Sequence, residues 1–450
     1  MPVVIAVVVT GRDAEFDRLL RSLDPVASDP NVHMVVLDNG GRDDGGMTAR
    51  LSRASHRCAG IRVAIPASRP LVPLHVARQE LSAAVARRAS SFARTPIVWM
   101  IDDDLTFEEV FVEDGVMAVR NVAAARIASA RGLSQTDIDV LVSGFTGDPP
   151  VRPEAVLASQ MIDLRTALRY AANRDPADVW TLASSYVRVD EDYYDHAESA
   201  DWDRPVCPVP WLPRVGTART VGDQVRALLD EACDIPRGCT PFRPLLAAMQ
   251  KPPVRVARAD RGGNTIFRGL AHLLAHPYPA FPIGERFSRR SDMVGLNVLV
   301  RRDRTVAAKG GLTLRHDRTL QPPLTHDIEP WLAEFGGVLL SRATAPGCAD
   351  AVTAESLKAM AHRRADRIAR SLASGALTCK DCLTELDDPR AWWNREPTVR
   401  ASSEALSDEL HRVSDVLVNL HRGGLDQALR SEDLQRRVLA ACTELRGTCT

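Results

Sequence analysis

The sequence predicts an α/β protein built on a mainly parallel sheet, with a helical insertion and a helical C-terminal region. Three observations predict it. Short apolar runs alternate with amphipathic stretches over residues 1–101, polar clusters follow the ends of these runs, and helical periodicity dominates after about residue 327. Such an alternation is typical of sheets that carry helices on both faces.

The N-terminal part of the chain holds most of the predicted sheet. Residues 3–9 are a continuous apolar run ended by a glycine-containing turn, which is typical of a strand buried on both faces. Further strands are predicted over 32–38, 60–66 and 97–101, and helices over 13–23 and 76–92. Because ligands of parallel sheets bind where the strands end, we expect the polar residues at 10–12, 38–44 and 102–104 to converge on one crevice.

Residues 105–250 are predicted to form a largely helical insertion that covers this crevice. Its helices are expected over 117–132 and 154–174, followed by a proline-rich, irregular segment over 203–216. Strand-like runs return over 254–259, 262–267, 297–302 and 312–317.

The remaining chain is predicted to be helical. Amphipathic stretches over 354–374 and 403–422 carry apolar residues at helical spacing. We therefore expect an α/β domain over 1–326, which includes the insertion, and a helical C-terminal region over 327–450.

The composition is that of a soluble globular protein. Hydrophobic residues make up 45% of the chain and charged residues 26%, and the formal net charge is −1. This balance gives no long-range attraction to nucleic acid or to an anionic membrane. The opening apolar run is too short for a signal peptide, and no segment reaches the roughly eighteen apolar residues of a membrane span. We expect a cytoplasmic protein.

Two features of the C-terminal region are interpreted as structural. Cys379 and Cys382 form the one CxxC pair among nine cysteines. A zinc site would need a second pair at a suitable spacing, so reduced thiols within a helix are the favoured interpretation over a metal or redox role. Trp392 and Trp393 could form a sugar-stacking platform, but exposed or core tryptophans of a helical tail are the favoured interpretation.

The segment 97–107, IVWMIDDDLTF, runs a buried strand directly into three aspartates. Adjacent carboxylates repel one another and need a compensating charge where they leave water. Asp102 and Asp104 could both reach a divalent cation, which prefers oxygen ligands and is often completed by phosphate oxygens. Such a cation would stabilise a diphosphate leaving group. On this motif alone, a solvated acidic turn that caps a helix near Thr106 is the simpler interpretation.

Four motifs in order along the chain favour the metal-binding interpretation. They are TGR at 10–12, LDNGGRD at 37–43, HVARQELSAAVARR at 75–88 and WMIDDD at 99–104. Together they resemble the family-2-like nucleotide-sugar glycosyltransferases of GT-A fold, whose Rossmann-like, mainly parallel sheet lies between helices. The chain departs from the family pattern at Gly41, where the family has serine, and at Gln79, where it has asparagine.

The resemblance implies a role in donor binding for several matched residues. Thr10 and Arg12 would help to hold the nucleotide base and ribose. Asp38 would contact a uracil ring, which favours a UDP-linked donor. Arg78 would pair with the nucleotide or its phosphates.

The metal ligands implied by the resemblance come from distant parts of the chain. Asp102 and Asp103 would contact the donor, and Asp102 and Asp104 would bind Mn²⁺ or Mg²⁺. His316 stands where several GT-A enzymes supply a histidine that completes the metal shell, and imidazole suits Mn²⁺ better than Mg²⁺. A structural histidine is the alternative, and Asp317 is a second choice of ligand. Of the three aspartates, Asp103 is expected to tolerate replacement by asparagine best.

The second half of the domain offers residues for the acceptor. At Gly263 and Asn264, between two strand-like runs, the backbone could approach a sugar or acceptor because glycine has no side chain. Asp292 is the candidate base that deprotonates an acceptor hydroxyl, with helix capping or pairing to an arginine as the alternative. Arg289 and Arg290 could hold an anionic acceptor or the diphosphate.

The sequence therefore predicts a metal-dependent glycosyltransferase of hexosyltransferase type, which moves a sugar from a UDP-sugar to a soluble intracellular acceptor. If Asp292 is the base, the anomeric configuration inverts. One alternative is a nucleotidyltransferase, although residues 10–16 lack the glycine-rich loop that holds its triphosphate. The other is a non-catalytic nucleotide- or carbohydrate-binding protein. We expect no nucleic-acid partner and no membrane span, and we expect any homo-oligomer to form through residues 327–450.

Overall fold

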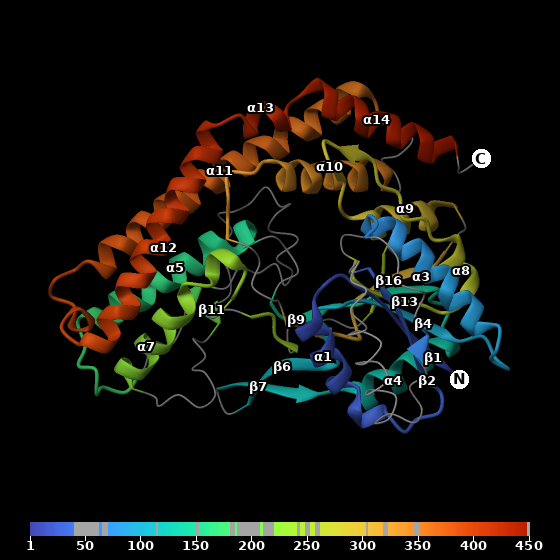
Figure 1. Cartoon of the computed structure of the whole chain (residues 1–450), viewed down its shortest axis with the longest axis horizontal. Coiled ribbons are helices and arrows are strands. Elements are labelled where there is room, and N and C mark those ends of the chain that lie inside the picture. The colour runs from blue at the N-terminus through green and yellow to red at the C-terminus, as the bar shows by residue number, and fades with distance from the viewer. Residues whose placement is uncertain are drawn as a thin grey trace.

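The computed structural model in Figure 1 has an α/β part around the N-terminus and a long helical arm. The structure describes residues 1–39, 63–64, 71–113, 116–148, 153–180, 185–186, 208–209, 220–240, 244–247, 253–256, 262–302, 305–317, 323–345 and 352–447. Parts of the predicted crevice and insertion, among them residues 40–44 and 210–216, lie outside these described residues.

An eight-stranded sheet forms the centre of the α/β part. In spatial order its strands are β12 (Val254–Arg255), β16 (Ala307–Lys309), β8 (Val140–Val142), β13 (Asn264–Phe267), β4 (Ile97–Asp102), β1 (Val3–Val9), β2 (Val32–Asp38) and β3 (Val63–Ala64). Strand β1 is parallel to both of its neighbours, and only β12 and β13 run opposite to the other strands. The predicted mainly parallel α/β fold is confirmed.

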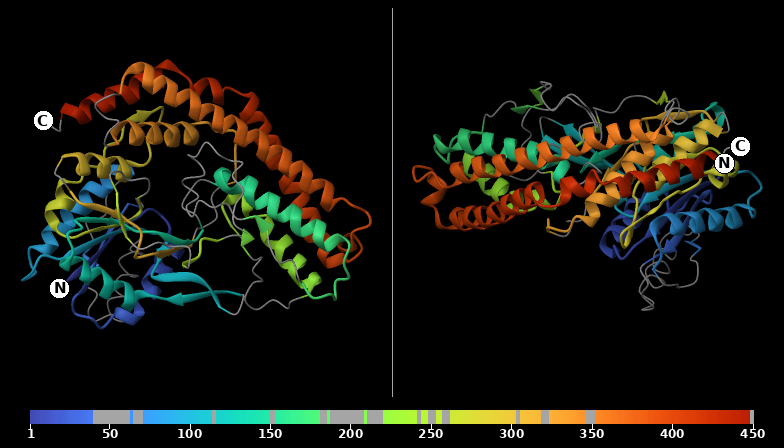
Figure 2. Two further views of the ribbon diagram at one scale, coloured as in Figure 1. Left: turned by 180° about the vertical axis from the view of Figure 1, so that it is seen from behind. Right: turned by 90° about the horizontal axis from the view of Figure 1, so that it is seen from above.

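Every residue of β1 is buried, because helices cover both faces of the sheet. The helices are α1 (Asp13–Ser22) and α4 (Ala123–Gly132) on one face, and α3 (Leu74–Ala89), α8 (Leu270–Ala275) and α9 (Ser291–Arg302) on the other. Figure 2 shows these layers from two further sides. Since successive side chains of a strand point to opposite faces, an unbroken apolar run fills both cores.

A smaller sheet brings a late segment of the chain next to the aspartate triplet. Its strands are β5 (Leu105–Thr106), β17 (Leu314–His316) and β9 (Phe145–Gly147), with β17 in the middle. In this register His316 lies opposite Leu105, the residue that follows the triplet. The hairpin of β6 (Glu108–Glu113) and β7 (Val116–Asn121) continues from β5. Strand pairing therefore places His316 beside the carboxylates.

The C-terminal region is helical, as predicted. Helices α11 (Ala354–Leu386) and α12 (Pro397–Arg422) pack together and against α5 (Pro153–Ala172) and α7 (Val221–Ala232) to form the arm. Helices α10 (Glu329–Thr344), α13 (Leu425–Leu429) and α14 (Glu432–Gly447) complete this region, and α10 joins it to α9 of the α/β part.

The CxxC pair and the tryptophan pair lie in the core of the arm. Cys379 and Cys382 are buried free thiols on α11. Burial raises the pKa of both thiols, which keeps them protonated and unreactive. Trp392 and Trp393 are also buried and pack edge to face, with ring centroids 5.7 Å apart. The structural interpretation of these four residues is confirmed.

Two predicted elements are wrong. The helix expected over 117–132 is strand β7 up to Asn121 and becomes helix α4 only at Ala123, because its first part pairs with β6. The strand expected over 297–302 is the second half of α9, where the Asn297 side chain donates a hydrogen bond to a carbonyl of α10. A short apolar run does not distinguish a buried strand from a buried helix.

The segment 105–250 differs from the helical insertion that was expected. Its described residues include strands β5 to β9, and β8 belongs to the central sheet. The helices α5 and α7 of this segment pack against the C-terminal helices α11 and α12. The described part of the segment is thus divided between the sheet and the helical arm.

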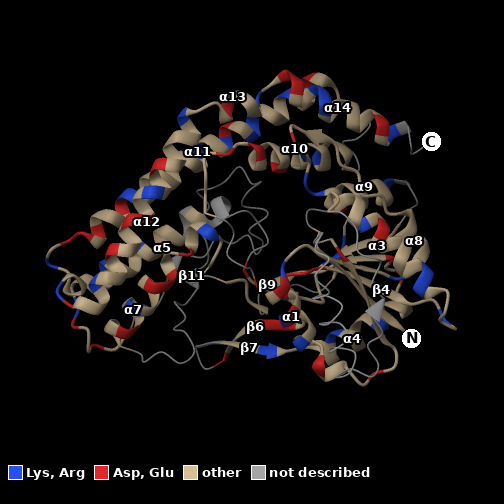
Figure 3. Ribbon diagram, viewed as in Figure 1, with Lys and Arg blue, Asp and Glu red and all other residues tan. Residues whose placement is uncertain are grey.

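Charged residues of both signs are interleaved along the C-terminal helices, as Figure 3 shows for α11, α12 and α14. This distribution agrees with a formal net charge of −1 for the whole chain. None of the helices in the described part of the chain has the length and apolar character needed to cross a membrane.

Candidate active site

The carboxyl ends of β1, β2 and β4 meet at one edge of the central sheet. In the parallel register Val9 lies beside Asp38, and Val8 lies beside Asp102. The polar residues at the ends of these strands, including Thr10 directly after β1, therefore start from the same edge. This is the arrangement that the sequence predicts.

Arg12 bridges the second and third aspartates of the triplet. Its Nη1 donates to Asp103 Oδ1 at 3.1 Å and to Asp104 Oδ2 at 2.6 Å, and the Thr10 backbone N–H donates to Asp103 Oδ2 at 3.1 Å. Burial raises the pKa of Asp103 to about 7, although Arg12 and the Thr10 N–H lower it. Burial also opposes the charge of Arg12, but the aspartates outweigh this effect and raise the pKa of the guanidinium.

Gly11 allows the chain to turn between β1 and Arg12. Its φ is +68°, in the left-handed region that favours glycine. Among the described residues, no atom lies within 4 Å of a Cβ added at this position. The reason for glycine is therefore the backbone conformation.

The contacts of the triplet disagree with the expectation that Asp103 is the most tolerant member. Both of its oxygens accept hydrogen bonds, so an amide would set its NH₂ group against an N–H of Arg12 or Thr10. The Asp102 side chain is 44% exposed, and its Oδ1 accepts from Arg78. An amide oxygen could replace that acceptor, so Asp102 should tolerate asparagine better than Asp103.

His316 reaches the triplet from β17. Its Nδ1 lies 2.8 Å from the backbone oxygen of Asp148, and its Nε2 lies 3.3 Å from Asp104 Oδ2. Because a carbonyl oxygen only accepts, Nδ1 carries a proton and donates it. The Nε2 lone pair then faces a carboxylate oxygen, and two acceptors are stable this close together only with a proton or a cation between them. The pair therefore attracts positive charge.

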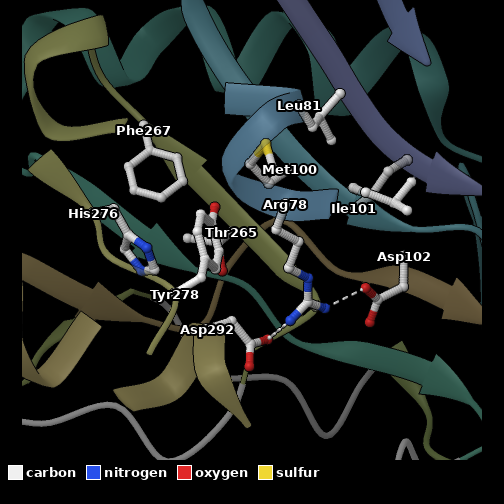
Figure 4. A pocket seen from close by; sticks show the side chains of 12 residues that line it. Arg78, Leu81, Met100, Ile101, Asp102, Thr265, Phe267, His276, Tyr278 and Asp292 are labelled. Carbon is white, nitrogen blue, oxygen red and sulfur yellow. Dashed lines mark hydrogen bonds and ion pairs between the residues drawn. The ribbon is translucent and has the colours of Figure 1, made fainter. Parts of the chain in front are cut away.

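Arg78 on α3 bridges Asp102 and Asp292, as Figure 4 shows. Its Nη2 donates to Asp102 Oδ1 at 2.8 Å, and its Nη1 lies 3.4 Å from Asp292 Oδ2. Burial opposes the charge of Arg78, but Asp292 and Asp102 outweigh burial and raise the pKa of the guanidinium. This arginine is thus held by the protein's own carboxylates.

Asp292 lies in the first turn of α9. Burial acts to raise its pKa, but Arg78 and the Met293 backbone N–H outweigh burial, so the pKa is lowered. The carboxylate is therefore ionised at neutral pH. Pairing with an arginine, one of the expected alternatives, is what the structure contains, and the role of Asp292 as a base stays a prediction.

Two glycines let these carboxylates lie against the backbone. A Cβ added at Gly263 would clash with the carboxylate of Asp102, and one added at Gly262 would clash with that of Asp292. Gly263 also has a φ of +80°. These positions require glycine for close packing of the aspartates, and contact between Gly263 and a ligand stays a prediction.

The side chain of Asn264 is hydrogen-bonded within the core. Its Nδ2 donates to the backbone oxygens of Gly144 at 2.8 Å and Leu312 at 3.4 Å, and its Oδ1 accepts from Trp99 Nε1 at 2.7 Å. All the hydrogen-bonding groups of this side chain are used, so it ties β13 to β4 and to two neighbouring loops. Approach of the backbone at Asn264 to a ligand stays a prediction.

His276 and Tyr278 contribute to the site although the motifs do not reveal them. A pocket at the Arg78 bridge is lined by Val8, Arg78, Leu81, Met100, Ile101, Asp102, Gly263, Thr265, Phe267, His276, Tyr278 and Asp292. Burial lowers the pKa of His276 to about 4 and raises the pKa of Tyr278 to about 12. The sequence HPYP at 276–279 could have indicated this pair. A residue before proline favours an extended backbone, which places side chains two residues apart on the same side. The ring centroids of His276 and Tyr278 are 4.6 Å apart.

The predicted metal pair is divided between two partners. Asp102 turns to Arg78, whereas Asp104 faces Arg12 and His316. No group of three or more His, Cys, Asp or Glu side chains that could hold a metal ion occurs in the described part of the chain. Asp102 and Asp104, which were predicted to bind one metal ion together, therefore pair with different arginines in the structure.

The pair of Asp104 and His316 fits one edge of an octahedral ion. Two adjacent ligands at about 2.1 Å from such an ion lie about 3 Å apart. The 3.3 Å separation of Asp104 Oδ2 and His316 Nε2 is close to this value. One or two protein ligands are enough where phosphate oxygens and water complete the shell. These two residues could therefore hold Mn²⁺ or Mg²⁺ together with a diphosphate.

The remaining predicted residues pair with other side chains. Arg290 Nε donates to Glu334 Oε1 at 2.6 Å, and Arg289 Nε lies 3.6 Å from Glu334 Oε2. Asp317 Oδ2 lies 2.7 Å from Arg18 Nε. Holding an anionic acceptor stays a prediction for the exposed Arg289, and metal binding stays a second choice for Asp317.

Comparisons with known proteins give structural similarity only. No family model and no curated protein matches the chain. It is similar to the mannosyltransferase PcManGT from Pyrobaculum calidifontis in complex with GDP-Man and Mn²⁺, with a TM-score of 0.39, 10% identity and coverage of 93% of this chain and 86% of that one. It is also similar to S. aureus TarS, with a TM-score of 0.33, 9% identity and coverage of 92% and 55%.

Both structural neighbours are GT-A glycosyltransferases, the class that the sequence motifs resemble. Their TM-scores are below 0.5, a range in which similarity carries no argument about ligand or reaction. The function must therefore be inferred from this chain's own residues.

Proposed function

We propose that the chain is a metal-dependent glycosyltransferase, which moves a sugar from a nucleoside diphosphate donor to a small-molecule or sugar acceptor. The main support is the meeting of Asp104 and His316, whose Oδ2 and Nε2 lie 3.3 Å apart at the carboxyl edge of the sheet. Arg12 and Arg78 supply two cationic groups at the same edge. Carboxylates, imidazole and arginines together suit a metal-bound diphosphate.

The donor nucleotide is proposed to bind over the ends of β1 and β2. Thr10 and Arg12 follow β1, and Asp38 ends β2 beside Val9. Asp38 matches the aspartate that contacts uracil in the family that the sequence resembles, so UDP is the preferred nucleotide. The diphosphate would then reach the aspartate triplet at the end of β4.

Asp104 and His316 are the proposed protein ligands of Mn²⁺ or Mg²⁺. When bound, the ion supplies a positive charge that stabilises the leaving diphosphate. The Asp148 carbonyl fixes the ring of His316 by accepting from Nδ1, so Nε2 is the ring nitrogen available as a ligand. Asp102 and Asp103 are proposed to contact the donor rather than to complete a protein-only metal shell.

Asp292 is the proposed general base. Arg78 keeps its carboxylate ionised, which is the state that can accept the proton of an acceptor hydroxyl. Attack on the anomeric carbon from the face opposite the diphosphate inverts its configuration. If Asp292 lies on the other face of the sugar, retention is expected instead, and the anomeric configuration of the product distinguishes the two.

A thermal-shift series tests this function. UDP, GDP, ADP and CDP are added with and without Mn²⁺, and at least one of them, UDP first, should raise Tm more with the ion than without it. The Mn²⁺-dependent part should disappear in Asp104→Asn and His316→Gln, and it should remain in His326→Gln, a matched exposed histidine. A chain whose Tm responds to no nucleotide would contradict the proposal.

A second measurement separates catalysis from binding. Asp292→Asn should keep the Mn²⁺-dependent shift, because its carboxylate is assigned to the acceptor and not to the metal. The same variant should lose release of UDP from a bound UDP-sugar, both in hydrolysis and in transfer. Wild-type binding with no donor turnover would favour a non-catalytic nucleotide-binding protein over a transferase.

A further inference from the structure

Arg12 lies where the proposed metal ion would have to bind. Its Nη1 is 2.6 Å from Asp104 Oδ2, the same oxygen that lies 3.3 Å from His316 Nε2. A carboxylate oxygen bonded to a guanidinium at this distance offers less charge to a second cation. Arg12 and a metal ion are therefore in competition for Asp104.

When no metal ion is bound, the aspartate triplet needs another positive charge nearby. Asp103 and Asp104 are both buried, and adjacent carboxylates repel one another. Arg12 Nη1 donates to an oxygen of each of these two carboxylates, Asp103 Oδ1 at 3.1 Å and Asp104 Oδ2 at 2.6 Å. In the structure Arg12 supplies the positive charge that offsets this repulsion.

Arg12 is also only partly enclosed. Its side chain is 37% exposed, so water reaches part of it. It follows Gly11, whose positive φ lets the chain turn between β1 and Arg12. A guanidinium on a flexible stem can exchange a carboxylate partner for phosphate oxygens, which it binds with the same planar fork.

We propose that Arg12 is a built-in counterion, which competes with the divalent cation for Asp104 and passes to the donor's diphosphate when the cation binds. This inference rests on the proposed function, because the cation and the diphosphate come from it. The cation alone should bind weakly, since it must displace Arg12 without offering the guanidinium a new partner. The cation and the nucleoside diphosphate should therefore strengthen each other's binding.

Arg18 provides a matched control for the loss of charge. It lies on α1, one to two turns beyond Arg12, and its side chain is 33% exposed. Arg18 Nε pairs with Asp317 Oδ2 at 2.7 Å and not with Asp104. Arg18→Gln therefore removes the same charge from the same region but leaves the proposed competition intact.

The test is a Mn²⁺ titration without nucleotide, in which electron paramagnetic resonance measures the free ion. Arg12→Gln should bind Mn²⁺ at least about tenfold more tightly than the wild type, and Arg18→Gln should stay within about twofold. The double variant Arg12→Gln/Asp104→Asn should lose this gain, which assigns the ion to Asp104. If Arg12→Gln binds Mn²⁺ no more tightly than the wild type, the inference is wrong.

A repeat of the titration with UDP present distinguishes this inference from the proposed function. The wild type should gain more affinity for Mn²⁺ from UDP than Arg12→Gln gains, because only the wild type must move its arginine. A gain in Arg12→Gln with Mn²⁺ alone, and no effect of UDP on either protein, would support the counterion and contradict the nucleotide-binding function.

Arg12→Lys keeps the test valid if Arg12→Gln folds poorly. Lysine retains the positive charge, but its shorter side chain and more strongly hydrated ammonium group should hold Asp103 and Asp104 less closely than Arg12 Nη1 does. Its Mn²⁺ affinity should lie between those of the wild type and Arg12→Gln, about threefold above the wild type. Mn²⁺ should also raise the Tm of either Arg12 variant more than that of Arg18→Gln. Equal shifts in all variants would contradict the inference.

Discussion

Two arginine-centred clusters lie at the carboxyl edge of the sheet, and they differ in their access to water. The Arg12 cluster comprises Arg12, Asp103, Asp104 and His316, and the Arg78 cluster comprises Arg78, Asp102, Asp292 and His276. The arginine side chain is 37% exposed in the Arg12 cluster and 12% exposed in the Arg78 cluster. A cation that exchanges with a ligand must reach solvent, whereas one that supports the fold need not. Similar ion pairs should therefore exchange partners more readily in the Arg12 cluster and contribute more to stability in the Arg78 cluster.

The largest effect is expected from removing the buried arginine. Arg78→Met leaves Asp102 and Asp292 without their cation and should lower the free energy of unfolding by about 3 kcal/mol. Arg12→Gln should cost about 1 kcal/mol, because water screens the more exposed Arg12 pairs. Urea unfolding measures both values. Mn²⁺ should restore the stability of Arg12→Gln but not that of Arg78→Met, and equal rescue of both variants would remove the distinction between the clusters.

The next effect concerns transfer rather than stability. Asp104→Asn should lower kcat/KM for sugar transfer about 100-fold at a fixed Mn²⁺ concentration, which corresponds to about 2.7 kcal/mol of transition-state stabilisation. Glu108→Gln is the control, since Glu108 lies on β6 just after the triplet but pairs with Arg315. Similar losses in both variants would show that the general charge of the region matters and that Asp104 has no special role.

The Arg78 cluster should make stability depend on pH. Burial lowers the pKa of His276 to about 4, below its ordinary value of 6.5. Between pH 6.5 and pH 4, His276 is therefore largely protonated in the unfolded chain and largely neutral in the folded chain. The stabilisation is complete above pH 6.5 and is lost as the pH falls toward 4, with about 2 kcal/mol lost by pH 5.

Urea unfolding at pH 7 and pH 5 measures this dependence. His276→Gln should flatten the decline, whereas His411→Gln, an exposed histidine on α12, should leave it unchanged. A decline of the same size in His276→Gln and the wild type would exclude His276 as its cause.

The smallest effect distinguishes two neighbouring aspartates. Asp103→Asn should destabilise the protein by about 1 kcal/mol, because both Asp103 oxygens accept hydrogen bonds from N–H donors. Asp102→Asn should have a smaller effect, since its amide oxygen can still accept from Arg78 and its side chain is 44% exposed. Thermal unfolding of the two variants gives the order, and the reverse order would favour the expectation from sequence alone.

Much of the sheet could be predicted from sequence because its strands are unbroken apolar runs. Strands β1, β2 and β4 match their predicted ranges closely, and the convergence of Thr10, Asp38 and Asp102 follows from parallel pairing. The strand β7 and the end of α9 could not be predicted, because tertiary contacts decide the structure of short apolar segments.

The candidate site was predictable in its residue types but not in its pairings. The motifs identify both arginines and all three aspartates, yet no spacing rule tells which arginine meets which carboxylate. The core role of Asn264 and the presence of His276 depend on contacts between segments far apart in the chain. The division of the site into the Arg12 and Arg78 clusters therefore depends on tertiary contacts that the sequence motifs do not reveal.

A calorimetric titration of UDP into the wild type and Asp104→Asn, with and without Mn²⁺, tests the proposed metal site most directly. Mn²⁺ should tighten UDP binding to the wild type by at least about tenfold and leave the binding of UDP to Asp104→Asn unchanged. Equal UDP affinity of the wild type with and without Mn²⁺ would contradict the claim that Asp104 and His316 hold a metal ion for a nucleotide donor.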